Sequence, residues 1–167
     1  HIYHSEKTTF GTIVNSLFFY SQAMNRIAIG IGSNSHNADN SVKSAIVWCS
    51  EIFSNVVASS VYITDPVGKK AISVGRRYSN AVIVGNTPLN KDEIITSLKD
   101  YENNHGRTLS SRSTGIVTID LDLVIYNDEI LKPTDINRDY FRLGFEEIGI
   151  LNDLSRRSTT GLPTSAL

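Results

Sequence analysis

The sequence predicts an α+β domain, and three patterns along the chain predict it. Short apolar runs rich in β-branched residues alternate with stretches in which apolar residues recur at helical spacing. Polar turns marked by glycine, proline and asparagine separate them. The chain has 167 residues, which suffice for one such domain and hardly for two.

The domain is expected to begin with a strand and a helix. Residues 26–32 form an apolar run with glycines, which is typical of a central strand. The polar loop after it ends at Asp39 or Asn40, either of which is expected to cap a helix. One apolar face should pack this helix against a sheet: Val42, Ala45, Ile46, Cys49, Ile52 and Phe53.

Two strands are predicted next, on either side of a basic loop. Residues 56–64 are rich in β-branched side chains, and the strand ends before Pro66 because proline cannot donate a strand hydrogen bond. Residues 69–77 contain four basic side chains and are expected to form a loop. Residues 78–84 are the third predicted strand, which ends at the turn 85–88.

A second helix and a last strand complete the pattern. Asn90 is expected to cap the helix, and Glu93 three residues later completes a capping box. Residues 116–126 form the longest predicted strand. The order is therefore βαββαβ, a ferredoxin-like arrangement in which two helices cover one face of a four-stranded antiparallel sheet.

The predicted domain spans residues 24–149. Residues 1–23 are interpreted as an N-terminal extension that need not be native, because Met24 directly precedes the first strand. Residues 150–167 are expected to be a flexible tail, since their composition offers little apolar surface to bury. No apolar run reaches the ~20 residues that span a bilayer, so no membrane association is expected.

Charge and cysteine content narrow the class further. The net charge of −1 gives no overall attraction for nucleic acid, and none is expected as a partner. Cys49 is the single cysteine, so an internal disulfide is impossible and a cytoplasmic location is expected. We expect a monomer or a weak homodimer.

Two acids stand out in the last predicted strand. Because alternate strand residues share a face, Asp120 and Asp122 should project together, roughly 7 Å apart, away from the helices. The opposite face should hold Ile119, Leu121, Leu123 and Ile125. Two such carboxylates suit Mg²⁺, which takes carboxylate and phosphate oxygens. The alternative is an exposed sheet face with ordinary solvated acids.

Basic and planar groups surround this strand in the sequence. Six basic residues fall in the loops that flank the third and fourth strands: Lys69, Lys70, Arg76, Arg77, Arg107 and Arg112. A triphosphate site without a Walker motif needs such side chains, although loops are often simply polar. Tyr78 and Asn80 share a strand face and suit a planar heterocycle, although for Tyr78 alone simple packing in the core is the more common explanation.

Five segments resemble the 6-hydroxymethyl-7,8-dihydropterin pyrophosphokinase family in order and spacing. They are Ile29-Gly-Ile-Gly-Ser-Asn34, Ser60-Val-Tyr-Ile-Thr-Asp-Pro-Val-Gly68, Tyr78-Ser-Asn-Ala81, His105-Gly-Arg107 and Thr118-Ile-Asp-Leu-Asp-Leu123. The resemblance covers residues 26–131. It implies an ATP-dependent diphosphokinase of folate biosynthesis, which transfers diphosphate to the pterin hydroxymethyl group and releases AMP.

The resemblance also implies roles for single residues. Asp120 and Asp122 correspond to the aspartates that hold two Mg²⁺ ions, and Arg107 joins them as a catalytic residue. The implied pterin site consists of Thr64, Val67, Tyr78 and Asn80. The implied ATP site consists of Glu102, Arg107 and Arg112.

The chain also departs from the family pattern. Val117 stands where the family has an arginine, and Tyr140 stands where it has a histidine that contacts phosphate. Phe141 and Phe145 are the candidates for the aromatic residue that closes the pterin site. These departures leave two alternatives: a weakly active or inactive pterin- or nucleotide-binding relative, and an interaction domain that uses its open sheet face.

Overall fold

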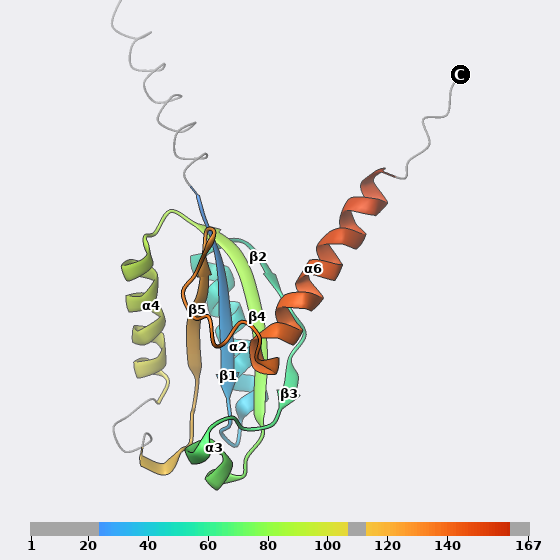
Figure 1. Ribbon diagram of the computed structural model, residues 1–167. Helices are drawn as coiled ribbons and strands as arrows, with labels where there is room; N and C mark the ends of the chain where they lie inside the picture. Colours follow the sequence, from blue (N-terminus) through green and yellow to red (C-terminus); the bar gives the residue numbers. More distant parts are fainter. Residues whose placement is uncertain (1–23, 107–112, 161–167) are drawn as a thin grey trace, which may run out of the picture.

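The computed structural model describes residues 24–106 and 113–160, and these residues form one layered α+β unit (Figure 1). The strands are β1 (Asn25–Ser33), β2 (Ser54–Ala58), β3 (Tyr62–Thr64), β4 (Tyr78–Thr87), β5 (Asp120–Tyr126) and β6 (Glu129–Ile130). The helices are α2 (Ala38–Ile52), α3 (Lys69–Val74), α4 (Lys91–Asn104) and α6 (Asp139–Thr160). The predicted N-terminal extension, residues 1–23, lies outside the described residues.

All strand pairs of the sheet are antiparallel, in the order β2-β4-β1-β5-β6, with β3 also paired to β4. The register sets which residues of β4 and β5 lie on either side of β1. Gly32 of β1 lies between Asn80 of β4 and Asp120 of β5, and Gly30 lies between Val82 and Asp122. The glycines at positions 30 and 32 therefore lie between the strand with the predicted pterin-binding residues, β4, and the strand with the predicted metal ligands, β5.

The α+β class and the antiparallel sheet are confirmed, but the number of strands is not. The predicted strand 56–64 is split into β2 and β3, which pair with successive parts of β4. Ser59 lies at the break, where its hydroxyl accepts a hydrogen bond from the Val82 amide at 2.9 Å. The short strand β6 adds a further edge beside β5.

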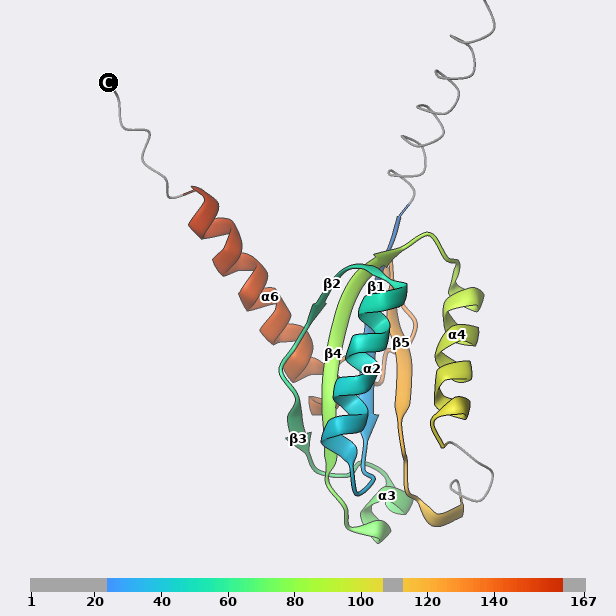
Figure 2. The same cartoon turned by 180° about the vertical axis from the view of Figure 1, so that it is seen from behind.

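The prediction that helices cover only one face of the sheet is wrong. Helices α2 and α4 do share one face, as Figure 2 shows from behind. Between them Trp48 packs on Tyr101, with 4.5 Å between the two ring centroids. Helix α6 begins on the opposite face (Figure 1). There it buries a second, smaller core made of Ala28, Val82, Val124, Phe141 and Ile148.

The last core strand differs from its prediction in two ways. Strand β5 begins at Asp120, four residues later than predicted, although Ile119 is buried as expected. The pairing of β5 with β1 also shifts between Ala28 and Ile29, which leaves Val124 as an extra residue. This bulge interrupts the alternation, so Ile125 packs in the second core and not towards α2 and α4.

Local predictions elsewhere also had mixed outcomes. The predicted loop 69–77 contains the short helix α3. Helix α2 begins at Ala38, earlier than the predicted caps allow, and Ile52 at its end is 39% exposed. The capping box of Asn90 and Glu93 is confirmed, with both reciprocal hydrogen bonds present.

Helix α6 continues past the predicted domain boundary at residue 149. The structure keeps it helical through Thr160, where a flexible tail was expected to have begun. Its residues 149–158 are all exposed. Among the side chains of α6 that the structure describes, Ile148 is therefore the last buried one, and the flexibility of the segment beyond it stays a prediction.

Candidate functional site

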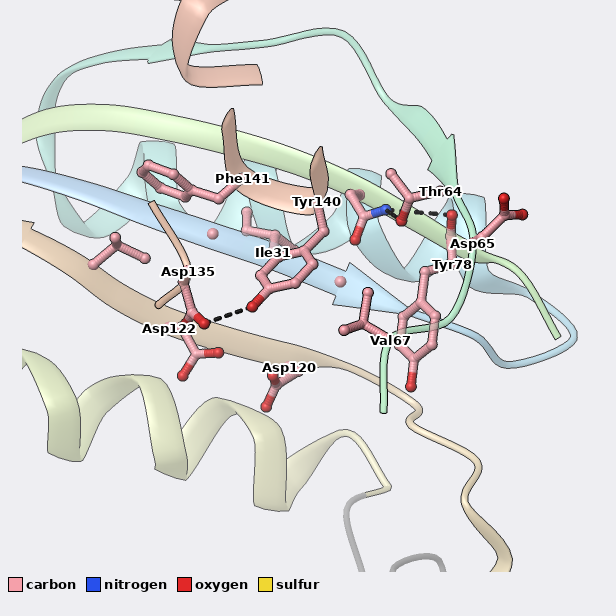
Figure 3. Close-up of a pocket in the computed structure, with 14 residues that line it drawn as sticks. Ile31, Thr64, Asp65, Val67, Tyr78, Asp120, Asp122, Asp135, Tyr140 and Phe141 are labelled. Carbon is pink, nitrogen blue, oxygen red and sulfur yellow. Dashed lines mark hydrogen bonds between the residues drawn. The ribbon is translucent and has the colours of Figure 1, made fainter. Parts of the chain in front are cut away.

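A cavity of about 310 Å³ opens on the face of the sheet that α6 covers at one end (Figure 3). Its lining comes from β1, β3, β4 and β5, from the loops that contain Asp65, Val67 and Asp135, and from the start of α6. The lining residues are Gly30, Ile31, Gly32, Thr64, Asp65, Val67, Tyr78, Asn80, Asp120, Asp122, Val124, Asp135, Tyr140 and Phe141. Six predicted site residues are among them: Thr64, Val67, Tyr78, Asn80, Asp120 and Asp122.

The two strand aspartates lie on one face, as period-two alternation predicts. Figure 3 shows Asp120 and Asp122 on the side of β5 that carries the other lining side chains. Burial raises the pKa of Asp122, and the negative charge of Asp120 raises it further. The two carboxylates therefore repel each other in a place where water screens them poorly.

Lys132 partly offsets this repulsion. Its ammonium group donates a hydrogen bond to Asp122, and the pair forms an ion pair at the edge of the cavity. Burial by itself lowers the pKa of Lys132, but the hydrogen bond and charge of Asp122 raise it overall. The pair thus keeps Lys132 charged without restoring the ordinary pKa of Asp122.

The opposite end of the cavity offers neutral hydrogen-bonding groups. The Asn80 amide donates a hydrogen bond to the Thr64 hydroxyl at 2.7 Å, and both side chains are buried. Their strands bring them together, because β3 pairs with β4 so that Tyr62 lies opposite Asn80. This arrangement leaves the Asn80 carbonyl and the Thr64 hydroxyl proton to meet a polar ring edge.

Tyr78 adds an aromatic side chain next to the neutral end, beside Val67 (Figure 3). Its phenol lies half-buried beside the acids, and burial together with the charge of Asp120 raises its pKa. Val67, which is half exposed, lies beside the Tyr78 ring (Figure 3). The neutral end and the acidic end therefore adjoin within one cavity.

The glycines of β1 keep the floor of the cavity open. A Cβ atom on Gly32 would lie 3.2 Å from the Asn80 carbonyl oxygen and 3.8 Å from Cδ1 of Tyr78. A Cβ atom on Gly30 would lie 3.4 Å from Cδ2 of Phe141. A side chain at either position would occupy space between the acids and the amide.

Helix α6 closes the cavity with two adjacent aromatic residues. The Tyr140 hydroxyl donates a hydrogen bond to Asp135 at 2.5 Å, and the Tyr62 hydroxyl donates one to the Tyr140 carbonyl at 2.7 Å. Phe141 is fully buried and lines the cavity. Phe145 stacks on Phe141, with 5.3 Å between the ring centroids, but it is not part of the lining. Of the two candidates for the aromatic residue that closes the site, Phe141 is therefore the better placed.

Several residues of the site were not predicted from the sequence. Asp65, Asp135 and Lys132 lie in loops, where single charged residues carry no signal of their own. The sequence distinguishes Tyr140 only as a departure from the family pattern. The glycines of β1 belong to the segment Ile29–Asn34, and their spacing at positions 30 and 32 indicates that one face of the strand has no side chains there.

Three predicted residues remain: Arg107, Arg112 and Glu102. Arg107 and Arg112 lie outside the described residues. Glu102 of α4 is buried, and its carboxylate accepts a hydrogen bond from the Leu121 amide at 2.8 Å. This bond ties the end of α4 to Leu121 of β5, the residue between the two strand aspartates. The contact of Glu102 with ATP stays a prediction.

Two arginines of the predicted basic set pair with side chains near the site. Arg77 forms an ion pair with Asp65 at 3.0 Å, where both side chains are largely exposed. Arg76 lies 3.0 Å from Nδ1 of His36, in the loop after β1. The end of β1 is held in turn by Asn34, whose side-chain oxygen accepts a hydrogen bond from the Val117 amide at 2.6 Å.

The acidic end of the cavity fits a hard divalent cation that also binds a ligand. Within residues 24–106 and 113–160, no group of three or more acidic, histidine or cysteine side chains is placed to hold a metal ion alone. Asp120 and Asp122 nevertheless provide two oxygen donors whose repulsion a cation would relieve. Mg²⁺ commonly binds one or two carboxylates and completes its shell with water and phosphate oxygens.

Comparison with known proteins points in the same direction. A family model described as 7,8-dihydro-6-hydroxymethylpterin-pyrophosphokinase matches residues 28–149, a range that ends where the predicted domain ends. A similar protein from Haemophilus influenzae is named 2-amino-4-hydroxy-6-hydroxymethyldihydropteridine pyrophosphokinase. It is 27% identical over 141 residues, which cover 83% of this chain and 86% of the relative.

Of the helices in the described residues, none has the length and apolar character needed to cross a membrane.

Proposed function

Since this chain belongs to the 7,8-dihydro-6-hydroxymethylpterin-pyrophosphokinase family, we propose that the cavity over β1 is its active site. The enzyme is a diphosphokinase. It transfers diphosphate from ATP to the hydroxymethyl group of 6-hydroxymethyl-7,8-dihydropterin and releases AMP, a step of folate biosynthesis. The site must therefore hold a flat heterocycle beside a polyphosphate.

The neutral end of the cavity is proposed to bind the pterin. Asn80 and Thr64 offer a carbonyl acceptor and a hydroxyl donor to the polar ring edge. Tyr78 and Val67 offer apolar surface to the ring faces. With the ring there, its hydroxymethyl group can point across β1 towards Asp120.

The acidic end is proposed to hold the metal and the phosphates. Asp120 and Asp122 would bind two Mg²⁺ ions, which supply positive charge to the transferring phosphate oxygens when bound. Asp120 lies nearer to Tyr78 than Asp122 does (Figure 3). A metal ion on Asp120 would therefore place its positive charge beside the pterin end. Helix α6 limits the access of water from one side, because Phe141 and Tyr140 lie over the sheet.

The remaining ATP contacts are proposed from the family resemblance. Arg107 and Arg112 are expected to meet the phosphates and to stabilise the charge that develops in the transfer. Glu102 is expected to act near the nucleotide from the end of α4. The buried thiol of Cys49 suits a reducing compartment, and we place the reaction in the cytoplasm with the protein as a monomer or weak homodimer.

One observation carries the assignment of this site. The two carboxylates suited to Mg²⁺ and the Asn80–Thr64 pair suited to a pterin line the same cavity, separated only by Gly32. Neither group by itself would distinguish this chemistry from an ordinary polar surface. Their adjacency matches a reaction that joins a pterin to a metal-bound diphosphate.

The test is AMP formation from ATP in the presence of Mg²⁺ and 6-hydroxymethyl-7,8-dihydropterin. Wild-type protein should release AMP only when the pterin is added. Asp122→Asn should lower the rate by roughly 10³-fold, because it removes a charged metal ligand from the site of transfer. Circular dichroism should show an unchanged fold.

A matched control is Asp128→Asn, since Asp128 is 93% exposed and pairs with Arg26 far from the cavity. This control should keep the wild-type rate. An Asp122→Asn rate equal to wild type would exclude the metal assignment. Pterin binding without turnover in the wild type would favour the inactive pterin-binding alternative.

A further inference from the structure

The described lining of the cavity is negatively charged. It contains Asp65, Asp120, Asp122 and Asp135, and among the lining residues that the structure describes there is neither a lysine nor an arginine. A nucleotide polyphosphate carries several negative charges of its own. It can enter this cavity only if cations meet it there.

Lys132 is the described cation that contacts the metal strand. Its ammonium group donates a hydrogen bond to Asp122, and its pKa is also raised by Asp135 and Asp120. The ammonium group thus contacts one lining acid directly and is within electrostatic range of two others. Two nearby arginines have ion-pair partners of their own: Arg77 pairs with the lining residue Asp65, and Arg142 pairs with Asp139 and Glu146 on α6.

The backbone holds Lys132 in place while its side chain can move. The Leu131 amide donates a hydrogen bond to the Val124 carbonyl at 2.8 Å, and the Asp135 amide donates one to the Lys132 carbonyl at 3.1 Å. The Lys132 side chain is nevertheless 42% exposed. Its ammonium group can therefore change partner without any change in the fold.

Lys132 and a divalent metal ion compete for the same Asp122 carboxylate. An Mg²⁺ ion on Asp122 withdraws electron density from its oxygens and repels a neighbouring ammonium group. The displaced ammonium group remains at the rim of the cavity, next to the position that the phosphates must occupy. An ammonium group close to phosphate oxygens forms strong charge-assisted hydrogen bonds.

We propose that Lys132 is a phosphate-binding residue of this enzyme, held by Asp122 in the free protein and transferred to a phosphate oxygen of ATP when the metal takes Asp122. The proposal rests on the proposed function. It adds to the proposed ATP site a cation from the loop after β6, a loop that contains none of the predicted ATP residues. It also implies that Lys132 weakens the binding of metal alone and strengthens the binding of the nucleotide.

These two effects provide the test. Lys132→Met removes the competitor for Asp122, so divalent metal alone should bind more tightly, by about threefold, as expected from a half-exposed ion pair. The same change removes a phosphate contact, so the Mg²⁺ complex of a non-hydrolysable ATP analogue should bind roughly tenfold more weakly. A purely structural role for Lys132 would weaken both or change neither.

The experiment uses the full chain and two titrations. Binding of Mn²⁺ alone is followed by the loss of its free electron paramagnetic resonance signal, and binding of the Mg²⁺–nucleotide complex is followed by calorimetry. Lys132→Arg should restore nucleotide binding because it keeps the charge. Lys91→Met is the matched control, since it removes an ion pair with Glu129 on β6, outside the cavity; it should change neither titration.

Opposite shifts in the two titrations support the proposal. Unchanged nucleotide binding by Lys132→Met, with normal binding by the wild type, would overturn it and leave the enzyme assignment in place. Wild-type protein that binds neither Mn²⁺ nor the Mg²⁺–nucleotide complex would overturn both. Weaker binding in both titrations would mean that Lys132 shapes the site and does not compete for Asp122.

Discussion

Gly144 of α6 lies directly against Tyr62 of β3: a Cβ atom on the glycine would stand 2.9 Å from Cε1 of the tyrosine ring. The same Cβ would also lie 2.9 Å from Oγ of Ser59 and from Cγ2 of Val82. Helix α6 can therefore reach the sheet only because this residue has no side chain. Tyr140, one helical turn earlier, depends on that contact for its place over the cavity.

Gly144→Ala is expected to destabilise the protein by about 1–3 kcal/mol, the usual cost of forcing an extra carbon into a packed interior. The Ser59 hydroxyl cannot move away easily, because it accepts a hydrogen bond from the Val82 amide. Thermal unfolding should show a lower Tm, and affinity for the pterin should fall because Tyr140 and Phe141 shift with α6.

Gly149→Ala serves as the control within the same helix. No atom lies within 4 Å of the added carbon, so the change should be neutral or stabilise the helix by about 0.5–1 kcal/mol. Equal Tm values for the two variants would show that α6 does not depend on its close approach at Gly144.

Gly32→Ala should weaken pterin binding more than it affects stability. The added carbon lies 3.2 Å from the Asn80 carbonyl oxygen, so the carboxamide must shift within the cavity. Calorimetric titration with 6-hydroxymethylpterin should show a loss of affinity of roughly tenfold, about 1.4 kcal/mol. Wild-type affinity in this variant would place the ligand away from Asn80.

Thr64→Val should lower the affinity for the pterin by a comparable factor. Here a polar group is removed from the cavity, whereas Gly32→Ala adds an apolar one. It removes the acceptor for the Asn80 amide, a buried group whose loss of a partner costs about 1–3 kcal/mol. Thr64→Ser keeps the hydroxyl and should retain binding within a few-fold. If Thr64→Val binds as tightly as Thr64→Ser, the hydroxyl has no part in recognition.

Cys49 should make stability depend on alkaline pH. Burial raises the pKa of its thiol from the ordinary 9.0 to about 12, so the folded protein keeps a proton that the unfolded chain loses. Its contribution is therefore fully present below pH 9 and is lost as the pH rises towards 12. The loss is at most about 1.4 kcal/mol per pH unit.

Denaturant unfolding of wild type and Cys49→Ala between pH 7 and 10.5 measures this contribution. The variant lacks the thiol but keeps every other titrating group. The wild type should lose stability faster than the variant above pH 9, so that the gap between them narrows. Parallel curves would contradict a buried thiol at this position.

Local rules were sufficient for the elements that those rules govern. The capping box of Asn90 and Glu93 depends on four consecutive residues, and it is present. Asp120 and Asp122 share a face because strand side chains alternate, and both line the cavity with Tyr78 and Asn80. The order of the elements then led to the antiparallel sheet.

Long-range pairing decided the features that local rules missed. Ile125 changes face because the pairing of β5 with β1 contains a bulge at Val124, and a bulge depends on the partner strand as well as the strand itself. Lys132 reaches Asp122 because β6 turns the chain back along β5. No pattern within either segment encodes these contacts.

The sequence alone thus determined the α+β class, the strand that carries the acids and six of the residues that line the cavity, because hydrophobic period and turn chemistry act over a few neighbouring residues. Only the tertiary structure decided that α6 covers the second face, that Gly144 lets it approach and that Lys132 pairs with the lining residue Asp122. These contacts join residues far apart in the chain, and their free energy depends on distances that exist only once the sheet has formed.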